Sequence, residues 1–302
     1  MDADLDTLAT ALYVAADDLL TAHPERLPER PAGGFPPLIS DAELCTLAVM
    51  QALLGFVSER RWLRLAHVEL VGMFPHLPQQ PDYNKRLRRL ADTMTWLTRQ
   101  LRDTTDLLDD DVWVADSTPV ECGRSRETVH RSDLAGYAEY GYCASHTRYF
   151  WGFRLHLLCT LHGLPVGWAV TGAKADERLT LMTILDTTPG LNTVGATLIA
   201  DKNYYGRVFE QHLADAGITL LRKARSGEKP RSGERFFKPL RQVIESINQT
   251  FKAQLDLERH GGHTIGGVYA RIAQRVLALT AAIWHNQNIG APTARSLTAY
   301  DH

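Results

Sequence analysis

The chain has 302 residues, of which 44% are hydrophobic and 23% charged, and its formal net charge at pH 7 is −2. This composition is typical of a globular protein with one large core and a smaller appended domain. The near-neutral balance excludes a protein that is basic throughout, so any contact with nucleic acid depends on where the positive charge lies. No run of about 18 consecutive apolar residues occurs, which argues against a membrane span.

The cysteines and the N-terminal residues indicate the cellular compartment of the protein. None of the four cysteines, Cys45, Cys122, Cys143 and Cys159, belongs to a Cys-x-x-Cys pair. The N-terminus shows no basic segment followed by an apolar one, as a secretory signal would. We therefore expect reduced thiols and a cytoplasmic protein.

Residues 1–105 show helical periodicity throughout. Ser40 and Glu43 have the spacing of a capping box, which predicts a helix starting there. A second helix is expected over residues 58–70, and prolines then break the chain before Asp82 caps a third. This part of the chain is therefore predicted to be an all-helical N-terminal domain.

The third of these helices is basic. It carries Lys85, Arg86, Arg88 and Arg89. Short helices followed by a basic one are typical of a helix-turn-helix, whose last helix contacts DNA. The alternative is a packing or dimerisation module whose basic face is simply solvated. The sequence leaves both open.

From about residue 110 the pattern changes to strands. After a strand at 112–116, a hairpin is expected from strands at 149–161 and 166–171. Further along, helices at 176–185 and 208–216 alternate with strands at 197–200 and 218–222. This order is typical of the α/β ribonuclease-H-like fold, a mixed sheet with flanking helices. In that fold the first strand is central and the fourth lies beside it.

Two of the predicted strands run apolar and then stop on an aspartate, Asp116 in one and Asp201 in the other. A buried carboxylate is costly unless it is paired or binds a cation, because it loses its hydration. The predicted topology makes the two strands neighbours. We therefore expect the two carboxylates to lie close together.

A third acid, Glu245, lies on a strongly helical segment. At 100° per residue the apolar side chains form one stripe, and the polar ones form a line along its edge. The stripe is Leu240, Ile244, Ile247, Phe251 and Leu255, and the polar line is Arg241, Glu245, Asn248 and Lys252. Asp116, Asp201 and Glu245 are thus the predicted catalytic and metal-binding residues, with phosphodiester cleavage and transfer as the chemistry.

The segment between Arg222 and Arg241 is rich in positive charge and in glycine. The only acids in it are Glu228 and Glu234, and its predicted DNA contacts are Arg225, Lys229, Arg231, Arg235, Lys238 and Arg241. Lys252, on the helix that follows, is a further predicted DNA contact. A track of phosphate contacts would release counterions, so its affinity would fall steeply with salt. The alternative is a solvated, mobile loop.

Taken together, these residues resemble a DDE-type transposase of a bacterial insertion sequence over most of the chain. Asp116 in Val-Ala-Asp-Ser-Thr-Pro and Asp201 in Ile-Ala-Asp-Lys-Asn-Tyr-Tyr-Gly match the family's two aspartate motifs. Arg241, Glu245 and Lys252 match the spacing of its Tyr, Arg, Glu, Lys signature. The tyrosine position of that signature is Lys238, which departs from the family pattern.

The resemblance implies a ribonuclease-H-like DDE catalytic domain at 106–290, after the helical domain at 1–105 and before a tail at 291–302. Two Mg²⁺ ions, which Mn²⁺ can replace, would be held with Asp116 bridging both and Asp201 and Glu245 each completing one. The activity implied is strand cleavage at the ends of the element, followed by attack of the freed 3′-hydroxyl on target DNA.

Partners implied by the resemblance are double-stranded DNA, as terminal inverted repeats and target, and a second copy of the chain on that DNA. Such a protein would associate with the nucleoid. Two alternatives use parts of the same machinery. One is a metal-dependent nuclease without strand transfer, and the other a DNA-binding protein that has lost catalysis.

Two further groups of residues have side chains that could form a site. His156, Cys159 and His162 have a spacing that suggests zinc, but strand residues alternate faces, so Cys159 points away from both histidines. Asp176 and Glu177 are spare acids. An error in the predicted triad would fall on them, so they are the natural control positions.

Overall fold

The computed structural model describes residues 3–29, 33, 36–123, 126–143, 147–231, 233, 237–293, 297 and 300. The side chains of Ala3, Asp4, Arg126, Lys238 and Arg241 are not described. The chain forms two compact units. The helical unit comprises Met1–Leu101 and Phe251–His302, and the sheet unit comprises Arg102–Thr250.

The first boundary between the units lies close to the expected domain limit at 105. The second differs from the expected limit at 290, because residues from Phe251 onward cluster with the N-terminal helices. The two compact units therefore do not coincide with the functional domains that the sequence predicts. The catalytic domain at 106–290 and the tail at 291–302 stay predictions, and of that tail only 291–293, 297 and 300 are described.

Helices make up most of the helical unit, and the last of them is buried on nearly every side from Val268 to His285. Within this unit that helix, α10, contacts α1, α2 and α4. In the described part of the chain, five α-helices precede the first strand: α1 (Ala3–Ala22), α2 (Asp41–Leu53), α3 (Glu59–Glu69), α4 (Gln80–Arg89) and α5 (Ala91–Asp103). The last of the described α-helices, α10, spans Ile265–Asn288. Short 3-10 turns are Pro24–Arg26, Asp106–Asp109 and Leu257–Arg259.

Capping explains where these helices begin. The predicted capping box is confirmed: Ser40 Oγ accepts from the Glu43 N–H at 3.1 Å, and Glu43 Oε2 accepts from the Ser40 N–H at 2.6 Å. Ser58 caps α3 as expected. The third helix is present, but its start was predicted wrongly, since α4 begins at Gln80, two residues before Asp82. Pro81 fits its first turn, where no N–H is needed.

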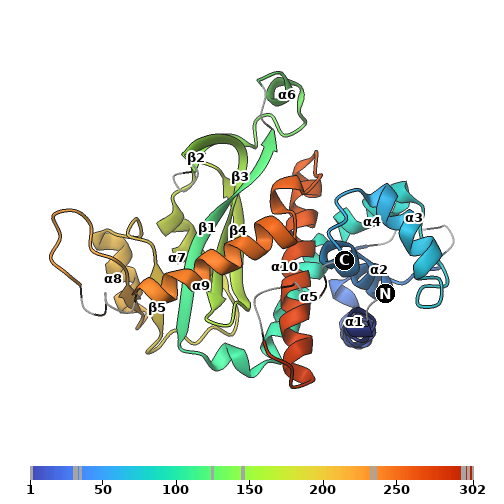
Figure 1. Cartoon of the computed structure of the whole chain (residues 1–302), viewed down its shortest axis with the longest axis horizontal. Coiled ribbons are helices and arrows are strands. Elements are labelled where there is room, and N and C mark those ends of the chain that lie inside the picture. Colours follow the sequence, from blue (N-terminus) through green and yellow to red (C-terminus); the bar gives the residue numbers. More distant parts are fainter. Residues whose placement is uncertain are drawn as a thin grey trace. The chain divides into compact units, whose positions relative to one another are not determined.

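One six-stranded sheet organises the sheet unit (Figure 1). Its order is β2-β3-β1-β5-β6, and β4 also pairs with β3. β5 is parallel to both β1 and β6, whereas β3 is antiparallel to β1, β2 and β4. The strands are β1 (Val112–Gly123), β2 (Glu139–Cys143), β3 (Arg148–Thr160), β4 (Pro165–Gly172), β5 (Thr197–Ala200) and β6 (Thr219–Leu221).

This mixed sheet confirms the predicted ribonuclease-H-like fold, with the first strand central and the strand at 197–200 beside it. The sequence analysis missed β2 and the short helix α6 (Arg126–Arg131). In β2 the two buried positions are Gly141 and Cys143 while Tyr140 and Tyr142 are exposed, so its pattern of apolar residues is weak.

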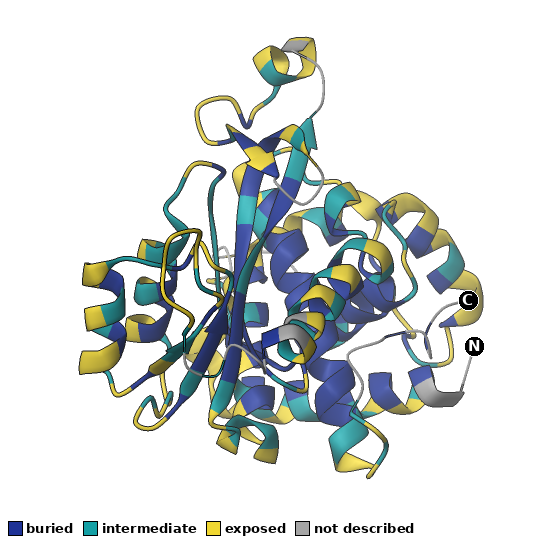
Figure 2. Ribbon diagram, turned by 60° about the vertical axis from the view of Figure 1, so that its left-hand side comes forward, coloured by how far each residue is buried: buried dark blue, intermediate teal, exposed yellow. Residues whose placement is uncertain are grey.

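The main core of the sheet unit lies between one face of the sheet and two helices, α7 (Glu177–Thr187) and α8 (Arg207–Asp215). Trp113 and Ala115 of β1 and Leu198 and Ala200 of β5 point into it, and Figure 2 shows the buried residues along the central strands. The helix α9 (Phe237–Gln249) contacts β1 and β5. Because strand side chains alternate, the residues between the core-facing ones are free to meet α9.

Within the described residues, no helix combines the length and the apolar character that crossing a bilayer requires.

Candidate active site

Asp116 and Asp201 occupy corresponding places on neighbouring strands. The parallel pairing of β1 and β5 sets Ala115 opposite Ala200, and the residue that follows each of them is an aspartate, Asp116 or Asp201. Adjacent strands lie about 4.7–4.9 Å apart, which brings the two residues side by side. The prediction that the strand containing Asp116 stops there is wrong. β1 continues to Gly123, because β3 pairs with it along this length.

Asp116 is held by a residue of α9. Asn248 Nδ2 donates a hydrogen bond to Asp116 Oδ2 at 2.8 Å. The pKa of Asp116 is raised to about 6, chiefly because the carboxyl is buried and further because Glu177 and Asp201 are negative. Donation from the Ser117 backbone N–H and from Asn248 opposes this rise. A carboxylate in this setting gains from a nearby cation.

The turn after β5 holds Asp201. Asn203 Nδ2 donates to Asp201 Oδ2 at 3.2 Å, and the Tyr204 N–H donates to the Asp201 carbonyl at 2.9 Å. Tyr204 is buried and packs on Phe209, so it belongs to the core. Tyr205 instead stacks under Arg225, whose Cζ atom lies 3.6 Å from the centroid of the Tyr205 ring.

Glu177, an acid that the sequence analysis left out of the triad, belongs to a polar cluster with Ser117 and Arg154 close to Asp116. Ser117 Oγ donates to Glu177 Oε1 at 2.6 Å, and Arg154 Nη1 donates to the same oxygen at 2.9 Å. Arg154 Nη1 also lies 3.0 Å from Ser117 Oγ. Ser117 follows Asp116 on β1 and therefore points to the opposite face. The cluster thus places the negative charge of Glu177 near Asp116, in addition to that of Asp201.

The proposed third acid, Glu245, lies on the same helix as Asn248. Glu245 is exposed on α9, one turn before Asn248, and it is Asn248 that contacts Asp116. Among the described residues, no three His, Cys, Asp or Glu side chains group closely enough to hold a metal ion. The place of Glu245 in a three-acid site therefore stays a prediction.

The polar line expected along this helix ends earlier than predicted. α9 stops at Gln249, and a π-helical turn, Thr250–Gln254, follows it. Lys252 lies in that turn, where the 100° spacing of an α-helix no longer holds. The expected alignment of Lys252 with Glu245 on a regular helix is therefore wrong. Of the expected stripe, Ile247 is fully buried, while Leu240 and Ile244 are half-buried.

The raised pKa of Asp116 predicts a measurable stability effect. Its folded value of about 6 exceeds the ordinary 3.8, so the stability that it contributes is present at low pH and lost as pH rises between these values. In metal-free protein, Asp116→Asn should therefore raise the free energy of unfolding at pH 8, by at most about 3 kcal/mol.

Urea unfolding in EDTA at pH 8 and below pH 4 checks this expectation. The two proteins should differ at the higher pH and converge at the lower one. Equal stabilities at both pH values would show that the carboxylate is not strained by its surroundings.

The basic segment after β6 is largely engaged within the protein. Arg222 is 1% exposed and binds Glu228 at 2.7 Å and Glu210 of α8 at 2.9 Å. Arg231 also binds Glu210, at 3.1 Å. These pairs anchor the loop to α8 rather than leaving a continuous row of unpaired cations.

Of the other predicted DNA contacts in this segment, two have described side chains. Lys229 and Arg225 are exposed. Arg235 lies outside the described residues, and Lys238 and Arg241 lie in α9 with side chains that are not described. The phosphate track therefore stays a prediction, with Lys229 and Arg225 as its clearest members.

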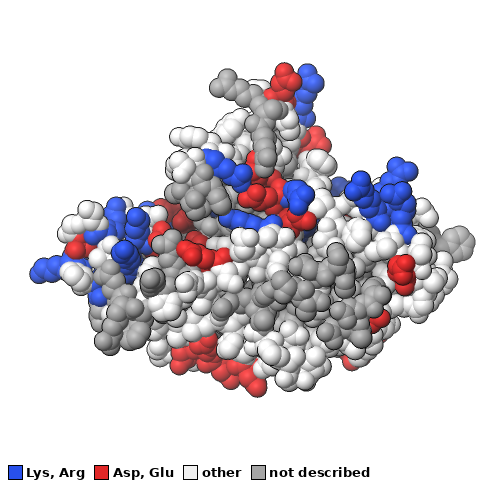
Figure 3. All heavy atoms as spheres, in the orientation of Figure 1, with Lys and Arg blue, Asp and Glu red and all other residues white. Residues whose placement is uncertain are grey.

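A second concentration of positive charge lies over α3 and α4 (Figure 3). On α4, Lys85 and Arg88 are exposed, whereas Arg86 binds Asp41 at 2.5 Å and donates to the Ile39 carbonyl. Arg89, also exposed, donates to the Glu29 carbonyl. The helix α3 was expected from the sequence, but its arginines were not among the predicted DNA contacts, although their Arg-Arg-x-x-Arg spacing is visible in the sequence. We call the exposed set Arg60, Arg61, Arg64, Lys85 and Arg88 the α3–α4 basic surface.

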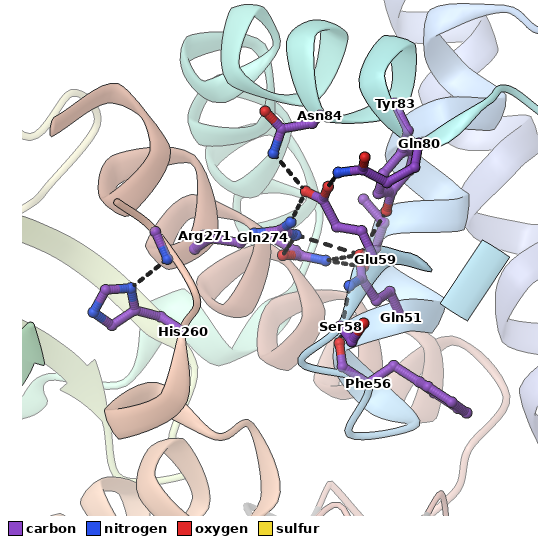
Figure 4. Close-up of polar contacts among 12 residues, drawn as sticks. Gln51, Phe56, Ser58, Glu59, Gln80, Tyr83, Asn84, His260, Arg271 and Gln274 are labelled. Atoms are coloured by element: carbon purple, nitrogen blue, oxygen red, sulfur yellow. Dashed lines mark hydrogen bonds and ion pairs between the residues drawn. The ribbon is translucent and has the colours of Figure 1, made fainter. Parts of the chain in front are cut away.

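A buried polar network fixes α3 and α4 (Figure 4). Glu59, the first residue of α3, accepts from Gln80 at 2.7 Å and from Asn84 of α4 at 2.8 Å. Arg271 of α10 donates to the same carboxylate. Nearby, Tyr83 Oη donates to Gln51 Oε1 at 2.7 Å. A buried carboxylate satisfied in this way holds the two basic helices in one arrangement.

Comparison with known proteins places these features in a family. Residues 108–264 match the family model described as the transposase DDE domain. Among solved structures, the chain is similar to the Mos1 mariner paired end complex with Mn, at 12% identity and a TM-score of 0.25 over 94% of this chain and 96% of that one. A pre-cleavage Mos1 transpososome is 13% identical, with a TM-score of 0.24 over 93% and 98%. No curated protein matches the chain.

Proposed function

Because the chain belongs to the transposase DDE domain family, we propose that it cuts DNA at the ends of a mobile element and joins the freed 3′-hydroxyl to target DNA. The observation that carries this proposal is the placement of Asp116 and Asp201, each directly after one member of the paired residues Ala115 of β1 and Ala200 of β5. Asp116 lies within the central strand β1, and Asp201 directly follows β5, so the sheet supports both carboxylates. Such rigid support is what catalytic carboxylates require.

The donor set suits Mg²⁺ or Mn²⁺. Asp116 is half-buried near two other negative charges, and the buried Oδ1 of Asn248 has no hydrogen-bond partner among the described residues, so a hard cation would relieve both. Asp116, Asp201 and Glu245 would hold it. When bound, such ions polarise the scissile phosphate and activate water or a 3′-hydroxyl.

The protein's own groups do the rest of the work. Asp116 and Asp201 supply fixed negative charge at the reacting centre, and Asn248 and Ser117 hold Asp116 in place through N–H donation. No side chain has to become a nucleophile, because water and the 3′-hydroxyl serve in turn. DNA would be held by phosphate contacts from the α3–α4 basic surface and from Arg225 and Lys229.

The second candidate is a nuclease that cleaves without strand transfer, since the same acids would serve it. Incubating the full chain with Mg²⁺, labelled duplexes carrying the inverted repeats that flank its gene, and a supercoiled target separates the two. Joined products support transposition, and cut ends alone support the nuclease. Binding without either product would favour a DNA-binding protein that has lost catalysis. Light scattering of the DNA complex tests the proposed assembly of at least two copies.

A further inference from the structure

Asn248 is the residue of α9 that reaches the aspartate pair. Its Nδ2 donates to Asp116 Oδ2 at 2.8 Å, whereas Glu245, one turn earlier, is exposed. Nothing in the family signature singles out this asparagine. The sequence placed it on the polar line of the helix without giving it a role.

The other polar atom of the same amide is unsatisfied. Asn248 Oδ1 is buried and has no hydrogen-bond partner in the described part of the chain. Buried polar oxygens are nearly always satisfied, and a structure that leaves one unpaired beside a functional group suggests a missing ligand. The neighbouring carboxylates are acceptors when ionised, so they have no proton to offer this oxygen.

A cation fits what these groups lack. Amide oxygens are ordinary ligands of hard divalent cations, alongside carboxylates. The three side chains Asp116, Asp201 and Asn248 come from β1, the turn after β5, and α9. Asn248 contacts Asp116 directly, and Asp201 follows the strand residue that is paired beside Asp116's neighbour Ala115. Glu245 could complete the same site from the outer side of the helix.

We propose that Asn248 Oδ1 is a direct ligand of the divalent cation held by Asp116 and Asp201, while its Nδ2 keeps Asp116 oriented. This inference rests on the proposed metal site and adds a neutral ligand to it. Two carboxylates and one amide give the inner site a formal charge of −2 before Glu245 joins. An additional carboxylate at position 248 would therefore bind the cation more tightly.

Mn²⁺ binding to the full chain without DNA tests this inference, measured from the electron paramagnetic resonance signal of the free ion. Asn248→Leu, which keeps the size but removes both polar atoms, should weaken Mn²⁺ binding by about 10-fold or more. Asn248→Asp should bind Mn²⁺ at least as tightly as the unmodified protein. Gln249→Ala, exposed on the same helix, is the matched control and should bind normally.

Each outcome decides one question. Normal Mn²⁺ binding by Asn248→Leu, with loss in Asp116→Asn and Asp201→Asn, would overturn the ligand role and leave the proposed function standing. Weaker binding by Asn248→Asp would also overturn it, since the N–H donation to Asp116 would then be what matters. Normal binding by both aspartate variants would refute the metal site itself. Circular dichroism of each variant confirms that the fold is kept.

Discussion

Asp116→Ala and Asp201→Ala should each abolish strand cleavage at the element ends, lowering its rate by on the order of 1000-fold or more. Removing even one preorganised group that stabilises developing charge costs on the order of 100- to 1000-fold. These aspartates would in addition lose a cation ligand. Cleavage of end-labelled duplexes in Mg²⁺ gives the measurement. Glu245→Ala should have the same effect if it completes the site.

A matched carboxylate controls for the loss of charge. Asp215 is exposed at the end of α8 and accepts a hydrogen bond from Gln211 of the same helix. Asp215→Ala should cleave at the normal rate. Normal cleavage by Asp116→Ala or Asp201→Ala would remove that residue from the site and with it the proposed chemistry.

Glu177 gives a second comparison within the site. Its carboxylate is bound by Arg154 and Ser117, so Glu177→Gln should retain cleavage at a reduced rate. If Glu177→Gln were inactive while Glu245→Gln cleaved normally, the third acid would lie on α7 and not on α9. The same variants therefore test both assignments.

The aspartate pair could be predicted from sequence because its causes are local. Apolar runs that end on an acid mark Asp116 and Asp201, and the order of strands and helices indicates that β1 and β5 are neighbours. Capping residues such as Ser40 likewise act within a few positions of themselves. The fold of the sheet unit follows from these signals.

Other features depend on partners far away in the sequence. Arg86 looked like a DNA contact on a basic helix, but it binds Asp41, 45 residues earlier. The sequence places Arg231 in the predicted phosphate track, and in the structure it forms an ion pair with Glu210 of α8. A helical projection treats Glu245 and Asn248 alike. Only the packing of α9 against the sheet decides that the amide reaches Asp116.

The α3–α4 basic surface should carry much of the salt-dependent affinity for DNA. Replacing Arg60, Arg64, Lys85 and Arg88 together by alanine should weaken binding to any duplex by about 10-fold or more near 0.1 M salt. Each phosphate contact contributes about 0.9 to the slope of log K against log salt, so the slope should flatten by up to about 3.6. Binding isotherms at several salt concentrations give both quantities.

The fold should survive this change, because all four side chains are exposed and none forms an ion pair within the described ranges. Thermal unfolding checks that point. Arg99→Ala, an exposed arginine on α5, should leave the salt slope unchanged. Replacing Lys229, Arg231 and Arg235 by alanine should flatten the slope less than the α3–α4 change does, since Arg231 is already paired with Glu210. An unaltered slope in the α3–α4 variant would show that these helices serve packing or dimerisation instead of holding DNA.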